Sequence, residues 1–325
     1  MIEKGLCDGC YDLLHFGHMN GFRQASEKCD YLVVGVHSAE SIRREKTEPV
    51  MGDEERYYMV ESCRWVKEVW RDAPFVSSIK EVEKRAITKV FHGNDFIGDC
   101  LGNDCYASIK EKGFFEFFER TEFISTTELV GRMLYRKNSD FSQMRLFEME
   151  EKNLAEEKRE YLLDLLKKFE IPKKEKKGKV VYVDGTFDMF HAGNASFFKK
   201  AKENGDYLIV GIHSSRDSIK EKKIAPVQTL IERQITVSGI KYVDEIITHV
   251  PFYVTEEFVK ANRIDLIIYG KSEKYYENVK NIIEIKKIVS DFPNLSTKII
   301  IKRIFDNYEK YRQRNIKRGY NMDLI

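Results

Sequence analysis

Short runs of apolar, β-branched residues alternate along the chain with segments whose apolar positions recur at helical spacing. In the second half, four such runs predict strands at 180–183, 207–212, 242–247 and 264–269. Helical patterns lie between strands, for example at 197–204 and 231–240. Continuously apolar runs are typical of strands that a parallel sheet buries on both faces. The pattern therefore predicts an α/β fold of right-handed β-α-β units in a doubly wound parallel sheet.

The first half of the chain returns in the second half in the same order. Residues 8–18 (DGCYDLLHFGH) return as 184–194 (DGTFDMFHAGN), and 30–38 return as 206–214. Further pairs follow after a one-residue insertion, including Glu55-Arg56 and Glu232-Arg233. A repeat of this length indicates two copies of one fold. We expect two tandem Rossmann-like domains related by duplication, at 1–138 and 179–325.

The segment 139–178 between the copies is heavily charged. Its apolar residues recur at helical spacing and are Leu154, Tyr161, Leu162, Leu165, Leu166 and Phe169. This spacing predicts an amphipathic helix that ends before Pro172, followed by a solvated hinge at 173–178. A nucleic-acid-binding tail is the alternative, but the charge balance of the chain favours a helical linker.

Composition narrows the class of protein. The chain has 325 residues, 42% of them hydrophobic, which is enough for two cores. Its 55 Lys and Arg against 53 Asp and Glu leave a net charge of +2, so we expect no nucleic-acid partner. No apolar run approaches the roughly 18 residues of a membrane helix, so we expect no stable membrane insertion. All six cysteines lie in the first third, which favours a reducing, cytoplasmic location over a disulfide framework.

Two histidines follow the first predicted strand. The spacing His15-Phe-Gly-His18 opens a helix and places both imidazoles on one face near its N-terminus. A helix N-terminus attracts anions, and Gly17 lets the backbone approach a phosphate closely. Phosphoryl and nucleotidyl transfer depend mainly on positioning and charge stabilisation, which such a site offers. Two surface histidines that merely cap a helix are the alternative.

Several segments resemble a known family. These are Gly9 to His18, Lys46-Thr-Glu-Pro, Arg64-Trp-Val-Lys-Glu-Val, His92-Gly-Asn-Asp95 and Arg120-Thr-Glu-Phe-Ile-Ser-Thr-Thr127. Together they resemble the cytidylyltransferases of the H-x-G-H nucleotidyltransferase superfamily. The tandem duplication resembles specifically the ethanolamine-phosphate cytidylyltransferases, because the choline-phosphate enzymes have one such domain followed by a membrane-binding helix. Phe123 departs from the family motif, which usually has glycine there.

The resemblance implies roles for matching residues. The catalytic set would be His15 and His18 at the α-phosphorus, with Lys46 and Arg120 on phosphates. Nucleotide-binding positions implied in the same way are Gly9, Cys10, Tyr11, Gly17, His92, Gly93, Asp95, Arg120, Thr121, Ser125 and Thr126. The residues themselves support the last two, because Ser125-Thr-Thr-Glu128 resembles a capping sequence before a helix at 129–134.

The second copy lacks part of this set. Its counterparts, a possible residual nucleotide site, are Thr186, Phe187, His191, Asn194 and Lys223. Asn194 replaces His18, and an amide cannot carry the positive charge that strengthens a bond to an anionic oxygen. We therefore expect the chemistry in the first domain, and a structural or regulatory role for the second.

The resemblance implies transfer of CMP from CTP to phosphoethanolamine with release of pyrophosphate, a step of phosphatidylethanolamine biosynthesis. Mg²⁺ would accompany CTP, held mainly by nucleotide oxygens, and no protein metal site is predicted. The alternatives left open are a phosphocholine or glycerol phosphate acceptor, AMP transfer, and a nucleotide sensor without turnover. The two domains are expected to pair within the chain, and a homodimer stays open.

Overall fold

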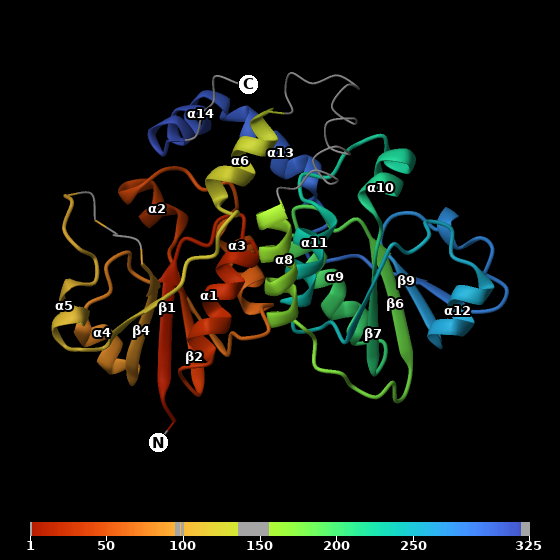
Figure 1. Cartoon of the computed structure of the whole chain (residues 1–325), viewed down its shortest axis with the longest axis horizontal. Coiled ribbons are helices and arrows are strands. Elements are labelled where there is room, and N and C mark those ends of the chain that lie inside the picture. Colours follow the sequence, from red (N-terminus) through yellow and green to blue (C-terminus); the bar gives the residue numbers. More distant parts are fainter. Residues whose placement is uncertain (1, 95–97, 99–100, 136–155, 320–325) are drawn as a thin grey trace. The chain divides into compact units, whose positions relative to one another are not determined.

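The computed structural model describes residues 2–94, 98, 101–135 and 156–319. The chain forms two compact units, Met1–Glu128 and Leu129–Ile325, which we call the first and second unit (Figure 1). No helix of the described ranges is long and apolar enough to cross a membrane.

Among its described residues, the first unit contains a five-stranded parallel sheet in the order β3-β2-β1-β4-β5. The strands are β1 (Lys4–Gly9), β2 (Tyr31–Val36), β3 (Glu68–Arg71), β4 (Ile87–Gly93) and β5 (Phe115–Phe118). The helices are α1 (Phe16–Ser26), α2 (Ala39–Glu45), α3 (Asp53–Glu61), α4 (Ile79–Lys84), α5 (Ala107–Glu111) and α6 (Thr126–Tyr135), which continues into the second unit. The order reverses between β1 and β4, so a crevice for a ligand is expected beyond their carboxyl ends.

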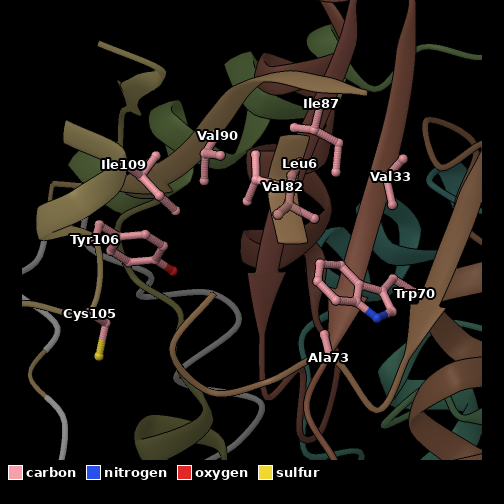
Figure 2. Packing of buried hydrophobic residues seen from close by; sticks show 10 residues of the cluster. All are labelled: Leu6, Val33, Trp70, Ala73, Val82, Ile87, Val90, Cys105, Tyr106 and Ile109. Atoms are coloured by element: carbon pink, nitrogen blue, oxygen red, sulfur yellow. The ribbon is translucent and has the colours of Figure 1, made fainter. Parts of the chain in front are cut away.

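The apolar strand residues account for this layering. Leu6, Val33 and Val90 from three neighbouring strands form one buried cluster with Val82 of α4 and Ile109 of α5 (Figure 2). Helices α1 and α3 pack on β1, β2 and β3. Because β-α-β crossovers are right-handed, α1 and α3 cover the face opposite to α4 and α5.

The second unit repeats this topology, with the order β10-β9-β6-β7-β8. Its strands are β6 (Val180–Gly185), β7 (Tyr207–Ile212), β8 (Glu245–Thr248), β9 (Leu266–Tyr269) and β10 (Glu284–Lys287). Its helices are α8 (Glu156–Lys168), α9 (Ala192–Lys202), α10 (Ser215–Lys222), α11 (Leu230–Ser238), α12 (Glu256–Asn262), the 3₁₀ helix η2 (Lys274–Tyr276), α13 (Thr297–Asp306) and α14 (Tyr308–Lys317). The predicted duplicated Rossmann-like fold is confirmed.

The fifth strand of each sheet was not anticipated. β10, with the sequence Glu-Ile-Lys-Lys, is mostly exposed, and β5 is only partly buried. An edge strand pairs on one side only, so it does not need the continuous apolar run that marks a central strand.

Only part of the segment 139–178 lies within the described residues. There, α8 packs on α11 and buries Leu162 and Leu165, as the helical spacing predicts. Residues 173–178 are mostly exposed, which fits the solvated segment expected from the sequence. Two of its lysines also form ion pairs, Lys174 with the buried Asp244 at 2.8 Å and Lys176 with Glu245 at 2.8 Å.

Candidate active site

The turn after β1 carries the two histidines to the start of α1. Tyr11 and Leu13 in this turn have φ of 47° and 48°, a left-handed conformation that side chains rarely adopt. The buried Asp12 carboxylate fixes the turn by accepting the N–H groups of Val50 and Met51, both at 2.9 Å. Arg56 adds bonds to the carbonyls of Cys10 at 2.7 Å and His37 at 2.6 Å. The strain is thus balanced by buried polar contacts.

The side chains of His15 and His18 stack and bond to backbone N–H groups at the N-terminus of α1. His15 is the N-cap residue, and its Nδ1 accepts the N–H of Gly17 at 3.1 Å. The Nδ1 of His18 accepts the N–H of His15 at 3.4 Å. The rings stack with centroids 3.9 Å apart. Because each Nδ1 accepts a bond, this hydrogen-bond pattern assigns the proton of each neutral ring to Nε2. The pair therefore offers two adjacent Nε2–H donors.

The charge of His18 differs from the expectation from sequence. Burial and, as a smaller cause, the nearby Arg120 guanidinium together lower the pKa of His18 to about 4. The ring is therefore neutral at pH 7 in the ligand-free protein. The positive charge at this site belongs to Arg120, and His18 contributes a neutral donor. The edge of the Tyr11 ring supports His18, with centroids 5.5 Å apart.

The segment 120–126 lies against the same helix start. Thr121 is buried, and its hydroxyl accepts a bond from Asn20 at 2.9 Å and donates to the Gly17 carbonyl at 3.3 Å. This hydroxyl fixes the segment to α1. Phe123 has a φ of 60°, which is the left-handed region that favours glycine. The backbone at Phe123 therefore suits the glycine that the motif resemblance implies at this position.

The predicted cap of α6 is confirmed. The hydroxyl of Ser125 accepts the N–H of Glu128 at 3.0 Å, and the hydroxyl of Thr126 donates to the Asp12 carbonyl at 3.1 Å. These contacts place the start of α6 beside the turn that carries His15. Helices α1 and α6 therefore both begin in this region, and helix N-termini attract anions.

Lys46 is the C-cap residue of α2 and lies near the carboxyl end of β2. Its ammonium is 5.1 Å from the centroid of the Phe75 ring, and Lys46 helps to lower the pKa of the buried His37. Burial is the main cause of that lowered pKa, and the ring binds the Ala73 carbonyl through Nδ1 at 3.0 Å. Lys46 is thus exposed beside the carboxyl end of β2.

His92 and Gly93 end β4. The Nδ1 of His92 lies 3.0 Å from the Gly93 carbonyl, and its ring is 5.2 Å from that of Tyr106 and 6.4 Å from that of Phe118. Gly9 ends β1, and its backbone runs against the Tyr11 ring. The predicted Asp95 lies outside the described residues.

Asp8 is a site residue that the sequence motifs did not single out. This carboxylate at the end of β1 is 3% exposed and accepts bonds from the Tyr106 hydroxyl at 2.6 Å and the Ser77 hydroxyl at 3.1 Å. Burial raises the pKa of Tyr106, and Asp8 raises it further. The available signal was an aspartate that directly follows an apolar strand in both copies. A buried carboxylate at a strand end is a candidate ligand for a cation.

The second unit keeps the bond to the N-cap N–H but has an amide in place of the second imidazole. His191 is the N-cap of α9, and the Asn194 side-chain oxygen accepts its N–H at 3.3 Å, as the Nδ1 of His18 does in the first unit. The Thr186 hydroxyl is bonded to Ser218 and to Lys222, and Phe187 repeats the left-handed φ of Tyr11.

Lys223 occupies the backbone position of Lys46 but not its side-chain position. Lys223 caps α10 as Lys46 caps α2, and each cap N–H binds the corresponding isoleucine carbonyl. It is the ammonium of Lys222, however, that lies over Phe252, 5.7 Å from the ring centroid. The one-residue insertion makes α10 one residue longer than α2, and Lys223 takes a left-handed φ of 58°.

Comparisons with known proteins agree with the geometry. The model of the family described as cytidylyltransferase-like matches residues 6–132 and 182–310. The chain belongs to this cytidylyltransferase-like family. A probable ethanolamine-phosphate cytidylyltransferase of Encephalitozoon cuniculi is 40% identical over 98% of this chain and 98% of that protein. The ethanolamine-phosphate cytidylyltransferases of Dictyostelium discoideum and Mus musculus are 36% and 31% identical, covering 96% and 98% of this chain and 93% and 89% of theirs.

The resemblance seen in the motifs is confirmed by these matches. In this cytidylyltransferase-like chain, both copies match the family, yet His18 and Arg120 occur only in the first. Among the residues described, no group of three or more His, Cys, Asp or Glu side chains could hold a metal ion.

Proposed function

We propose that this chain transfers CMP from CTP to phosphoethanolamine in its first unit. The observation that carries the proposal is the stacked pair of His15 and His18 at the start of α1, with Arg120 near enough to help lower the pKa of His18. The full-length relatives named ethanolamine-phosphate cytidylyltransferase support the choice of nucleotide and acceptor.

In the proposed reaction, a phosphate oxygen of phosphoethanolamine attacks the α-phosphorus of CTP in line. The new P–O bond forms as the bond to pyrophosphate breaks, giving CDP-ethanolamine and pyrophosphate. The Nε2–H groups of His15 and His18 donate to oxygens of the α-phosphate, whose charge shifts during the attack. Arg120, Lys46 and the backbone N–H groups at the start of α6 hold the remaining phosphate oxygens.

The acceptor's ammonium needs a counter-charge. Asp8 is the candidate, because its buried carboxylate lies beside the Tyr106 ring, with His92 next to that ring. Each carboxylate oxygen can accept a further bond beyond those from Tyr106 and Ser77. Aromatic rings next to a carboxylate favour an organic cation. We expect Asp8→Asn to raise the KM for phosphoethanolamine without a comparable change in the KM for CTP.

Mg²⁺ is proposed to arrive with CTP. The described side chains form no metal cage, so we assign no residue to the ion and route no step through it. Mg²⁺ keeps several waters and binds phosphate oxygens readily, which suits a nucleotide-borne ion. The cytoplasmic location and the oligomeric state stay predictions.

One experiment tests the proposal. The purified full-length chain is incubated with Mg²⁺, CTP or ATP, and phosphoethanolamine, phosphocholine or glycerol 3-phosphate, and pyrophosphate is measured. We expect release with CTP and phosphoethanolamine. Preference for another acceptor would overturn the acceptor assignment, and release only with ATP would overturn the nucleotide. No release with any pair would favour a nucleotide sensor.

A further inference from the structure

Helix α6 belongs to both units. Its first residues, Thr126 to Glu128, lie in the first unit, and Leu129 to Tyr135 lie in the second. Its start is fixed by the Ser125 cap and by the bond from Thr126 to the Asp12 carbonyl. Under the proposed function, the N–H groups of this start hold phosphate oxygens of CTP. Contacts that fix the later turns of α6 should therefore affect nucleotide affinity.

In the second unit, α6 is held by a bidentate ion pair. Arg132 donates from Nη1 to Oε2 of Glu232 at 2.8 Å and from Nη2 to Oε1 at 2.9 Å. Lys158 of α8 lies 3.6 Å from the same carboxylate. The Glu232 side chain is fully buried, whereas that of Arg132 is 19% exposed. Paired N–H···O bonds of this kind fix orientation as well as distance.

The carboxylate of this pair is held rigidly. Glu232 lies in the first turn of α11, where its Oε2 also accepts the N–H of Thr229 at 2.9 Å. Burial would raise the pKa of Glu232, but Arg132 and Lys158 hold it below its usual range. The carboxylate therefore stays charged at neutral pH, and a buried charge requires its partner. If Arg132 moved away, the buried Glu232 carboxylate would lose its bidentate partner, which is energetically costly.

We propose that Arg132 and Glu232 are positioning residues for CTP. Arg132 follows Thr126 by six residues, which is about 9 Å along a helix axis. Over so short a distance an α-helix is stiff, so a displacement at Arg132 reaches the N–H groups that face the nucleotide. The pair thereby makes nucleotide affinity depend on the second unit. This inference rests on the proposed function and explains why the second copy is retained although it lacks His18 and Arg120.

Two variants test the pair. Arg132→Lys keeps the positive charge but cannot form the bidentate bond. Glu232→Gln keeps an acceptor for the Thr229 N–H but loses the negative charge. Asp244→Asn is the matched control, because Asp244 is another buried carboxylate of the second unit, bound by Lys174, Lys202 and the Leu208 N–H, none of which lies in α6. For each protein we would measure the Kd of CTP with Mg²⁺ by calorimetry, the KM for both substrates, kcat and Tm.

Both α6 variants are expected to raise the Kd and KM for CTP roughly tenfold, which corresponds to about 1.4 kcal/mol of lost phosphate binding. The KM for phosphoethanolamine should stay within about twofold. The double variant should be no worse than the worse single variant, since the residues act as one unit. The control should lower Tm and leave the CTP constants unchanged.

An unchanged Kd for CTP in both α6 variants would overturn the inference, whatever happens to Tm. An equal loss of CTP affinity in Asp244→Asn would also overturn it, because the effect would then be general destabilisation. If the wild type binds CTP but turns over no acceptor, the proposed function fails, while the Kd comparison still decides the inference. No CTP binding by the wild type would overturn both.

Discussion

Replacing Gly17 with alanine tests whether the ring of His15 must stay where the structure places it. A Cβ on Gly17 would lie 2.9 Å from Cε1 and Nδ1 of His15 and 2.8 Å from Cγ2 of Ile124. Ordinary contacts of this type begin at 3.4 Å, so the ring must move by at least about 0.5 Å. The same movement stretches the bond between the Gly17 N–H and the His15 Nδ1.

The expected loss follows from that displacement. A misplacement of about 1 Å in a catalytic group can cost roughly 10² in rate, so we expect kcat/KM to fall between 10- and 100-fold. Stability should fall by at most about 2 kcal/mol, because a crowding cost of about 1–3 kcal/mol is partly offset by the roughly 1 kcal/mol that alanine gains over glycine in a helix. Pyrophosphate release from CTP and phosphoethanolamine measures the first quantity, and Tm measures the second.

The second unit supplies a matched control. A Cβ on Gly193 would lie 3.0 Å from the same two atoms of His191. Gly193→Ala should therefore shift Tm about as much as Gly17→Ala and leave kcat/KM near that of the wild type. Full activity in Gly17→Ala, or an equal loss in Gly193→Ala, would refute the assignment of chemistry to the first unit.

Three further predictions concern the same region. His18→Asn should lower kcat roughly 10²- to 10³-fold while Asn194→His leaves it nearly unchanged, and equal rates for wild type and His18→Asn would contradict this. The pKa of His18 is about 4 in the folded chain, against about 6.5 in the unfolded chain. Between these two pH values the unfolded chain binds more protons than the folded chain, so the free energy of unfolding decreases as the pH drops from 6.5 to 4. Between pH 7 and pH 5 the wild type should lose about 2 kcal/mol more than His18→Asn in urea unfolding, and parallel losses would contradict the lowered pKa. In urea unfolding, the free energy of unfolding of Phe123→Gly should exceed that of Phe123→Ala by about 1 kcal/mol, since only glycine relieves the φ of 60°. Equal values for the two variants would show that this backbone is not strained.

The fold was predictable because it depends on patterns that the sequence repeats. Central strands such as β7 appear as apolar runs, and the predicted 207–212 coincides with Tyr207–Ile212. β1 (Lys4–Gly9) extends beyond its apolar residues Leu6 and Cys7 to the polar Asp8, which is buried by its bonds to Tyr106 and Ser77. Long-range partners of this kind leave no local trace in the sequence.

The arrangement of the histidine pair was predictable from the sequence, but the charge of His18 and the use of the nearby hydroxyls were not. Histidine spacing correctly predicted two rings at a helix start, yet the neutral state of His18 depends on burial and on Arg120, a hundred residues later. Thr121 has a hydroxyl suited to phosphate, but the structure directs it to Asn20 and Gly17. Tertiary packing decides both features, so motif spacing alone could not.

The duplication separates what the fold needs from what the chemistry needs. Asp12 and Asp188 accept two backbone N–H groups each, from the loop after α2 and the loop after α10, and Arg56 and Arg233 each bind carbonyls at two strand ends. These devices persist in a copy that lacks His18, so their presence does not distinguish the unit that we propose to be catalytic. Asn194 keeps the cap bond that His18 makes, but its remaining donor is an amide Nδ2 in place of the ring Nε2. Since the cap survives without that nitrogen, the feature that distinguishes the first unit is the Nε2–H donor of His18 beside Arg120, which the proposed reaction requires.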